Sequence, residues 1–591
     1  MSLKSKLKRK VGKYKEGYIN SSIYKAYEEG IDENVAYFES RDGNDFTGNI
    51  FRLVEELSTG KYGDYQIYVY AKEGVVPKIE KLQKNYDLDI YKIVTKESIA
   101  TRILEKAKYI FTDSGIRPKF IKKPGQIMMN TWHGTPLKVM GIENVPEEHR
   151  LGSMQHTFYD SDYLLYPNDF MFEKMVRGYN IDRIYQGTVL LEGYPRNSVF
   201  FDSARQMEFK SKFNFEDKDV FVYMPTYRGT ILNRKDSAQK DVIDEYLTQL
   251  DARLNDSQVF LVKLHVFNHS QIDFSKFNHI KPFPEGYEVY DIINMADILV
   301  TDYSSVFFDF AVSRRKIIIF NYDEDEYLSD RNIYFPISDL PFPKVQDVDG
   351  LVDELNSPVN YDDKEFYNIF CKYEKPEAVE NICREVFKGM DVSIKKRIAN
   401  DNPNVLVYIG SLKDENVWKS LLENLAGIDL DEYNVFLSFR QWNRNYRENH
   451  EEIFKSFPDG ISVMPMRGAV NPTMNEKNDY DNIISDSWGG DYPSKLDKLF
   501  EREIRRYYHS LPFDKVINFD GTDRVELYMF KNFTTERILF TRENSIKPKL
   551  LKEIYSNYDL IVADSDDLKE FILNIVPDAE VVVKSNMKDL I

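Results

Sequence analysis

Polar side chains follow four apolar runs that are typical of buried strands. They are His133 after QIMMNTW, Pro225 and Thr226 after VFVYM, Lys263 and His265 in VFLVKLH, and Asp302–Ser305 after ADILV. In an open α/β sheet, ligands bind beyond the carboxyl ends of the strands. These residues are therefore the first candidates for a functional site.

His133 is the candidate whose type is hardest to explain by structure alone. It precedes Gly134, Thr135 and Pro136. Thr135 can cap a helix and Pro136 suits a first helical position, so we expect a helix to start here. A helix start does not require a histidine, whereas an imidazole that titrates near neutral pH can take a proton from a reacting group. His133 is therefore a candidate general base.

The DYSS stretch allows two interpretations. Ser304 and Ser305 precede apolar residues at helical spacing, so they can simply cap a helix. The free N–H groups and the dipole of that helix can also bind a phosphate. Asp309 lies one turn further on, where it can stabilise the dipole or accept hydrogen bonds from ligand hydroxyls.

Further cationic residues suit a phosphate ligand. Lys263 and His265 can neutralise charge, and Arg196, after a Gly-Tyr-Pro turn, can bind a phosphate through two nitrogens. A surface arginine is the alternative for Arg196. His265 and His269 lack the glutamate of an HExxH zinc motif, and the acidic run at 323–327 fits a solvated loop. We predict no metal site.

Length and composition limit the class of protein. A chain of 591 residues suggests three or four domains. Its net charge of -18 argues against a general nucleic-acid-binding protein, because phosphate backbones need a basic surface. Cys371 and Cys383 are the only cysteines, so neither a disulfide framework nor a zinc-ligand set is expected. A reducing compartment fits best.

The amino-terminal segment, residues 1–33, is locally basic. Its cationic residues before the first acid, Glu16, are Lys4, Lys6, Lys8, Arg9, Lys10, Lys13 and Lys15. Such a cluster is attracted to an anionic membrane surface, but a frayed, solvated terminus is an equal alternative. We find neither a signal peptide nor an apolar stretch long enough to cross a bilayer. We therefore expect a cytoplasmic protein, peripheral on the inner face of the membrane.

Strand-like and helix-like runs alternate from residue 34 onward, which predicts an α/β protein with parallel sheets. We divide it into an amino-terminal Rossmann-like domain at 34–205, a second at 206–399 and a third Rossmann-like unit at 400–591. The polar stretch at 472–495 is predicted to be a surface loop.

The joint order of the motifs resembles a known family. GQIMMNTWHGTPLK, SDYLLYPND, EGYPRN, YMPTYRG, VKLH and ADILVTDYSSVFFDF are similar to successive motifs of the TagF-like CDP-glycerol glycerophosphotransferases of teichoic acid synthesis. The likeness runs from about residue 34 to 390. It implies a GT-B fold, in which two Rossmann-like domains face each other across a cleft. It also implies transfer of glycerol phosphate from CDP-glycerol to a growing teichoic acid or capsule-like polymer, with release of CMP.

The resemblance also implies a set of site residues. Those on the amino-terminal side are Trp132, His133, Gly134, Thr135, Pro136 and Arg196. Those across the cleft are Pro225, Thr226, Lys263, Leu264, His265, Ser304, Ser305 and Asp309. His133 would be the base, while His265, Lys263, Arg196 and the serine amides would stabilise charge on the phosphate. No cofactor is expected, and without a DxD-type site no dedicated metal ion is expected either.

The third unit is similar to the first half of a retaining GT-B glycosyltransferase that is often fused to such enzymes. Its first loop, IGSLKDENVW, lacks the Gly-Gly and Asn-Gly usual there, and no donor domain follows. We interpret it as an interaction or acceptor-handling module, or as part of a longer chain.

Several alternatives remain open from the sequence. The donor can be CDP-glycerol or CDP-ribitol, and the acceptor a lipid-linked polyol phosphate or glycan. A GT-B glycosyltransferase that uses a nucleotide sugar is a second interpretation, and a non-catalytic polymer-binding subunit is a third. An anionic membrane surface is an expected partner, nucleic acid is not, and an oligomer is compatible with the sequence.

Overall fold

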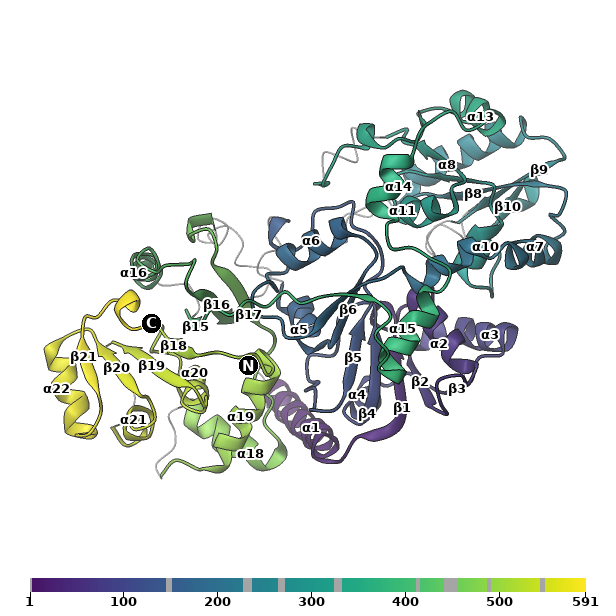
Figure 1. The fold of residues 1–591 in the computed structure, drawn as a ribbon. Helices are drawn as coiled ribbons and strands as arrows, with labels where there is room; N and C mark the ends of the chain where they lie inside the picture. Colours follow the sequence, from purple (N-terminus) through teal and green to yellow (C-terminus); the bar gives the residue numbers. More distant parts are fainter. Residues whose placement is uncertain are drawn as a thin grey trace.

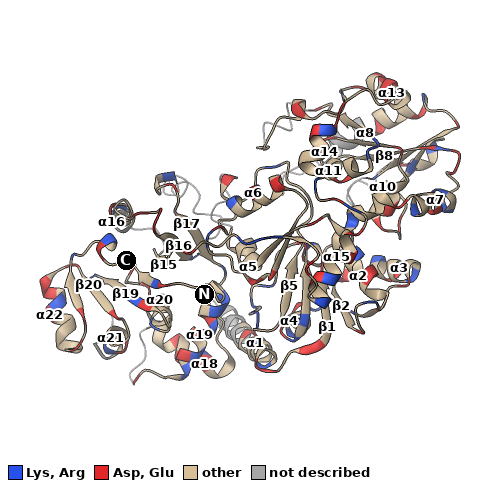
Figure 2. Cartoon of the chain, viewed as in Figure 1, with Lys and Arg blue, Asp and Glu red and all other residues tan. Residues whose placement is uncertain are grey.

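The protein consists of three α/β units, each built on one sheet, with the first unit between the other two (Figure 1). The computed structural model describes residues 3–144, 151–226, 236–263, 272–323, 332–410, 415–440, 455–485, 491–542 and 548–591. The predicted α/β class and its Rossmann-like units are confirmed. Figure 2 shows basic and acidic residues interspersed along the helices of each unit.

Within the described residues, no helix combines the length and the apolar character that a membrane span requires.

The first unit is built on an eight-stranded sheet in the order β14-β7-β6-β5-β4-β1-β2-β3. Its strands are β1 (Asp32–Glu39), β2 (Gln66–Tyr70), β3 (Ile90–Val94), β4 (Ala107–Thr112), β5 (Ile127–Asn130), β6 (Tyr163–Tyr166), β7 (Thr188–Leu191) and β14 (Ile394–Lys396). Its helices are α1 (Leu3–Glu28), α2 (Gly48–Ser58), α3 (Val76–Tyr86), α4 (Glu97–Leu104), α5 (Gly152–Asp160), α6 (Asp169–Gly178) and α15 (Ala378–Lys388). Strands such as β1 are apolar and buried along most of their length because helices cover both faces of a parallel sheet.

The second unit has a six-stranded parallel sheet in the order β10-β9-β8-β11-β12-β13. Its strands are β8 (Asp219–Met224), β9 (Gln258–Val262), β10 (Ile280–Pro282), β11 (Ile298–Thr301), β12 (Lys316–Phe320) and β13 (Lys344–Val345). Its helices are α7 (Ser203–Lys212), α8 (Asp236–Asp251), α10 (Val289–Met295), α11 (Val306–Phe310), α13 (Val348–Asn356) and α14 (Lys364–Phe370).

The third unit has a seven-stranded parallel sheet in the order β17-β16-β15-β18-β19-β20-β21. Its strands are β15 (Asn404–Tyr408), β16 (Asn434–Arg440), β17 (Ser462–Met466), β18 (Lys515–Asn518), β19 (Glu536–Thr541), β20 (Leu560–Ala563) and β21 (Val581–Val583). Its helices are α16 (Glu415–Leu425), α18 (Met474–Ile484), α19 (Lys495–Tyr508), α20 (Arg524–Phe530), α21 (Pro548–Tyr555) and α22 (Asp566–Ile575).

The order of strands reverses once in each sheet. The reversal lies between β1 and β4 in the first sheet and between β8 and β11 in the second. Each reversal leaves a crevice position beyond the strand ends that connecting helices do not cover, and ligands of open α/β sheets bind there. The reversal points of the first and second sheets are therefore positions where a ligand can bind.

The end of the predicted second domain returns to the first unit. Helix α15 packs on α2, and β14 pairs antiparallel with β7, with Ile394 opposite Leu191. The sequence pattern, by contrast, places these residues, 378–396, in the predicted domain at 206–399. The helix α1 lies on the first unit as well, and its Asn20 amide donates to the Pro472 carbonyl of the third unit at 3.0 Å.

Two local predictions were wrong. The stretch predicted as a loop at 472–495 contains helix α18, whose start is supported by the Glu476 carboxylate accepting from the Thr473 N–H at 2.8 Å. No helix begins at Thr135. There the backbone pairs with the second unit instead, since the Tyr334 N–H donates to the Leu137 carbonyl at 2.9 Å.

The return of α15 generates a stability prediction. Phe387 of α15 is buried against the first sheet, with its ring centroid 4.5 Å from Tyr109 and 5.5 Å from Phe111. Phe387→Ala should lower the free energy of unfolding of the first unit by about 3 kcal/mol, because it leaves a cavity. Hydrogen exchange of the β4 amides measures this loss.

The matched control is Phe571→Ala on α22, where the phenylalanine is 41% exposed. We expect that change to leave β4 unaffected. Equal exchange rates in the two variants would mean that α15 does not stabilise the first sheet.

Candidate active site

The reversal point of the first sheet is organised by Asp113, which follows β4. Its carboxylate accepts from the Ser40 hydroxyl at 2.6 Å and from the Arg41 N–H at 2.7 Å. Ser40 and Arg41 follow β1, so these hydrogen bonds join the ends of the two strands that flank the reversal point. The loops there are held in one arrangement.

His133 lies at this reversal point. Its Nδ1 is 2.7 Å from the Asp113 carbonyl oxygen. A carbonyl oxygen only accepts, so Nδ1 carries the proton and Nε2 presents a lone pair. The half-buried ring is thus held in the tautomer that a base requires. Burial and the positive charges of Arg41 and Arg196 lower the pKa of His133 to about 3, which keeps the imidazole neutral.

The residues on either side of His133 form a tight turn. The Trp132 ring is buried and stacks on the His133 ring at a centroid distance of 4.4 Å. Trp132 has a φ of 50° and Gly134 a φ of 147°, both in the region that favours glycine. A Cβ at Gly134 would lie 3.1 Å from the Ser305 Oγ, so the glycine allows close approach to the DYSS turn.

The reversal point of the second sheet is organised by Asp302, at the end of β11. Its carboxylate accepts from the Thr226 N–H at 2.8 Å, from the Thr226 hydroxyl at 2.7 Å and from the Tyr303 N–H at 2.6 Å. The loop after β8 and the DYSS turn are therefore joined, as the loops of the first sheet are. Thr226, Ser304 and Ser305 remain half-buried.

The helix that follows DYSS is short. Helix α11 has five residues and continues as a single 3-10 turn, so its dipole is smaller than that of a helix of several turns. The Ser305 side chain makes no capping hydrogen bond, which differs from the plain capping interpretation. The Ser304 Oγ lies 3.5 Å from the Val306 nitrogen.

Arg196 connects the two units. Its Nη1 donates to the His133 carbonyl at 3.0 Å, and its Nη2 donates to the Asp309 carboxylate at 2.8 and 3.0 Å. Both side chains of this ion pair are buried. Burial alone would lower the pKa of Arg196, but Asp309 raises it, so the guanidinium is charged. The structure thus places Arg196 on Asp309 and on the backbone of the histidine turn.

Three further side chains surround this ion pair. The Tyr290 hydroxyl donates to Asp309 at 2.9 Å, and the Asn197 amide reaches both Asp309 at 3.2 Å and Glu374 at 2.8 Å. Burial, with the Asp309 charge, raises the pKa of Glu374 to about 8. The Glu374 carboxyl is therefore largely protonated at neutral pH, which avoids a second buried negative charge.

Lys263 brings a further cation to the same edge of the second sheet. It follows β9, and its ammonium lies 5.4 Å from the Phe283 ring centroid. Burial and the charge of Lys78 lower its pKa. Lys78, from α3 of the first unit, pairs with Asp45. Two lysines from the two units thus lie close together, with the Asp45 and Glu288 carboxylates beside them.

Most of the predicted site residues converge at this junction of the first and second units. Thr135 is buried, and its hydroxyl accepts from the Asn168 amide at 2.9 Å, so it fixes the turn instead of capping a helix. Pro136 is buried and Pro225 half-buried. Leu264 and His265 lie outside the described residues, so their predicted roles stay predictions.

Sequence reasoning missed several residues of the junction. Arg41, Asp113, Tyr290 and Glu374 were not among the candidates, although Asp113 follows the strand-like run KYIFT and Arg41 follows NVAYFES. The strand-end rule that selected His133 would have found both. Glu374 lies in a loop and Tyr290 on a helix, and neither has a local signal.

Comparison with known proteins gives a family match for residues 23–388, to the model described as CDP-Glycerol:Poly(glycerophosphate) glycerophosphotransferase. A teichoic acid glycerol-phosphate transferase of Staphylococcus aureus is 29% identical over 60% of this chain and 93% of its own length. A teichoic acid ribitol-phosphate polymerase of the same organism is 27% identical over 53% of this chain and 65% of its own length. The family match ends before the third unit.

A solved structure shows a similar fold over part of the chain. The wall teichoic acid polymerase TagF matches with a TM-score of 0.51 at 22% identity, covering 63% of this chain and 93% of that chain. The GT-B-like arrangement expected from the motifs is thereby confirmed.

The electrostatics of His133 give a testable prediction. Arg41→Gln should raise the pKa of His133, because it removes a positive charge that disfavours the imidazolium. The pKa can be followed by NMR titration of the imidazole. His133 also makes stability depend on pH. Below about pH 6.5 the imidazole binds a proton in the unfolded chain but not in the folded protein. The free energy of unfolding should therefore fall by at most about 1.4 kcal/mol per pH unit.

Arg102→Gln on α4 is the control, because Arg102 is exposed and does not act on His133. An unchanged pKa in the Arg41 variant would contradict the electrostatic account of this histidine.

Proposed function

The chain belongs to the CDP-glycerol:poly(glycerophosphate) glycerophosphotransferase family, and from this premise we propose that His133 is the general base of its transfer reaction. The protein is accordingly an enzyme of teichoic acid synthesis that transfers glycerol phosphate from CDP-glycerol to a polymer. The observation that carries the proposal is the hydrogen bond from His133 Nδ1 to the Asp113 carbonyl, which leaves Nε2 free to accept a proton.

In the proposed reaction, an acceptor hydroxyl attacks the phosphorus that carries the glycerol. The bond from this phosphorus to the bridging oxygen breaks, CMP leaves with that oxygen, and the glycerol phosphate is joined to the acceptor. The hydroxyl proton passes to His133 Nε2. A hydroxyl is a weak nucleophile, so a positioned base should accelerate the step by roughly 10² to 10⁴-fold.

A pKa of about 3 is too low for an efficient base, and we propose that binding of the donor raises it. The pKa is lowered partly by Arg41 and Arg196. An anionic pyrophosphate bound at the junction would offset both charges and raise the pKa of His133. The histidine would thus become a stronger base only when the donor is present.

We propose that the donor phosphates lie against the DYSS turn and the two lysines. Ser304 and Ser305 offer hydroxyl and backbone donors at the reversal point of the second sheet, and Lys263 and Lys78 supply positive charge. Thr226, whose N–H and hydroxyl both donate to Asp302, holds the adjoining loop in place. Phosphoryl transfer depends mainly on such positioning and on charge stabilisation. His265 completes this set as a prediction from the motif.

Arg196 and Asp309 act as positioning residues in this proposal. Their ion pair holds the backbone of the histidine turn against the second unit. The guanidinium is therefore engaged with protein groups, and we no longer propose that it binds the phosphate by itself. Trp132 and Gly134 set the ring and the spacing of the same turn.

The donor polyol, the acceptor and the location are also proposals. We propose glycerol as the polyol on the family description, with CDP-ribitol as the alternative that a ribitol-phosphate relative suggests. The acceptor is a lipid-linked polymer, reached from the cytoplasmic face of the membrane with help from the basic segment at 4–15. We propose that the third unit is an accessory module for the acceptor.

A direct assay tests this function. The purified chain is incubated with CDP-glycerol, CDP-ribitol or UDP-sugars and a lipid-linked acceptor, and release of CMP or UDP is measured. We expect CMP release from CDP-glycerol. Release of UDP alone would favour a glycosyltransferase, and polymer binding without turnover would favour a non-catalytic subunit.

In that assay His133→Ala should lower kcat by roughly 10² to 10⁴-fold, because the hydroxyl loses its base. His279→Ala is the matched control, since His279 precedes β10, at the opposite end of the strands from the candidate site, and lies beside Asp251. Circular dichroism of both variants checks folding. Unchanged turnover in a folded His133 variant would refute the assigned role.

The pH dependence of the wild type provides an independent check. The acid limb of kcat/KM reports the free enzyme and that of kcat the donor complex. Because a bound anion should raise the pKa of His133, the acid limb of kcat should lie at higher pH than that of kcat/KM. Coincident limbs would contradict the proposed activation by the donor.

A further inference from the structure

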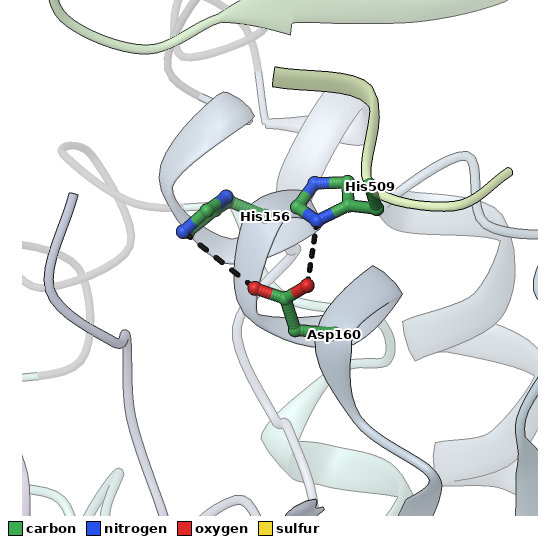
Figure 3. Close-up of side chains that lie close together, drawn as sticks. All are labelled: His156, Asp160 and His509. Atoms are coloured by element: carbon green, nitrogen blue, oxygen red, sulfur yellow. Dashed lines mark hydrogen bonds and ion pairs between the residues drawn. The ribbon is translucent and has the colours of Figure 1, made fainter. Parts of the chain in front are cut away.

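Two histidines and an aspartate converge at the interface of the first and third units (Figure 3). His156 and Asp160 lie four residues apart on α5 and thus on one face of that helix. His509 follows α19 of the third unit with a φ of 58°, which turns its ring toward α5. All three side chains are buried.

The donor atoms of this cluster lie close enough together to reach one metal ion. One donor atom from each residue lies within 4.8 Å of the others. The Asp160 carboxylate is 2.7 Å from His509 Nδ1 and 3.8 Å from His156 Nε2. In a tetrahedral zinc site, metal–ligand bonds of about 2.0 to 2.2 Å place donors about 3.4 Å apart. Small side-chain movements would therefore complete such a site.

Two buried atoms of the cluster lack a hydrogen-bond partner. Among the described residues, neither His156 Nε2 nor the second Asp160 oxygen makes a hydrogen bond, although both residues are more than nine-tenths buried. An unpaired buried polar atom is costly and calls for an explanation such as an ion. The two atoms lie opposite each other at 3.8 Å, joined by a dashed line in Figure 3.

We propose that His156, Asp160 and His509 bind one late first-row divalent metal ion, such as zinc, which ties α5 to the third unit. Two imidazoles and a carboxylate suit zinc, with a fourth position open to water. The site is structural and separate from the junction that holds His133. The earlier prediction that the chain has no metal site did not consider these residues, which lie far apart in sequence.

The charges around the cluster indicate which ions it favours. Arg506 lies in the same small pocket, but its charge is paired with Glu503. Arg467 also lines this pocket and donates to the Ile116 carbonyl at 3.2 Å, so its positive charge opposes a cation. The cluster has only one carboxylate and a nearby positive charge on Arg467. It should therefore not bind magnesium or calcium, which need several oxygen ligands.

Metal titration of the full chain tests the proposal. The chain is stripped with a chelator and titrated with cobalt, whose visible absorption reports its ligands, and then with zinc in competition with a chromophoric chelator. We expect one tightly bound equivalent of either ion and no binding of magnesium. Zinc should also raise the midpoint of thermal unfolding of the stripped protein.

Asp160→Asn and His509→Ala should each weaken zinc binding by more than roughly 10- to 100-fold, which is the loss that removing a residue that only orients a ligand causes. His279→Ala is the control, because His279 also lies beside two aspartates, Asp251 and Asp256, but Asp256 is fully exposed. Failure of the wild type to bind cobalt or zinc at micromolar concentration, or equal binding by all variants, would overturn the proposal. The cluster would then be a hydrogen-bonded contact between the units.

Discussion

The buried Arg196–Asp309 ion pair is the interaction on which the arrangement of the candidate site depends. One guanidinium contacts the carboxylate of the second unit and the His133 carbonyl of the first. Two buried charges are tolerated only when they are well paired, and here Tyr290 and Asn197 supply the remaining hydrogen bonds to Asp309. The relative position of the two sheets is thus coupled to the backbone of the histidine turn, and any movement of one unit changes the surroundings of His133.

The first and second sheets have the same hydrogen-bonded arrangement at their reversal points. In each, an aspartate at the end of a central strand accepts hydrogen bonds from the loop after the neighbouring strand: Asp113 from Ser40 and Arg41, and Asp302 from Thr226. The rigid loops that result meet where Gly134 approaches Ser305. Preorganised groups of this kind cost little reorganisation during a reaction, which is what phosphoryl transfer requires of a protein.

The third unit is joined to the first by contacts of a different kind. The Gln155 amide donates to the Val463 carbonyl at 2.8 Å, Arg506 donates to the Pro118 carbonyl at 3.1 Å, and His509 pairs with Asp160. Helix α5 takes part in both regions, because its Phe158 packs on Trp132 while His156 and Asp160 face the third unit. The accessory unit therefore supports the element that lies behind the histidine turn.

The sequence by itself determined the α/β class, the three units and most residues of the junction, because strand periodicity and polar strand ends are local signals. It named His133, Ser304, Ser305 and Arg196 as site candidates, which the structure brings to one junction. It also predicted a helix start at Thr135 and a loop at 472–495, where long-range pairing and a cap decide the outcome. Only the tertiary structure decided that Arg196 pairs with Asp309 and which tautomer His133 adopts. It also decided that α15 returns to the first sheet and that His156 meets His509. Each depends on groups that are distant in the chain, and no local pattern encodes which distant group becomes the partner.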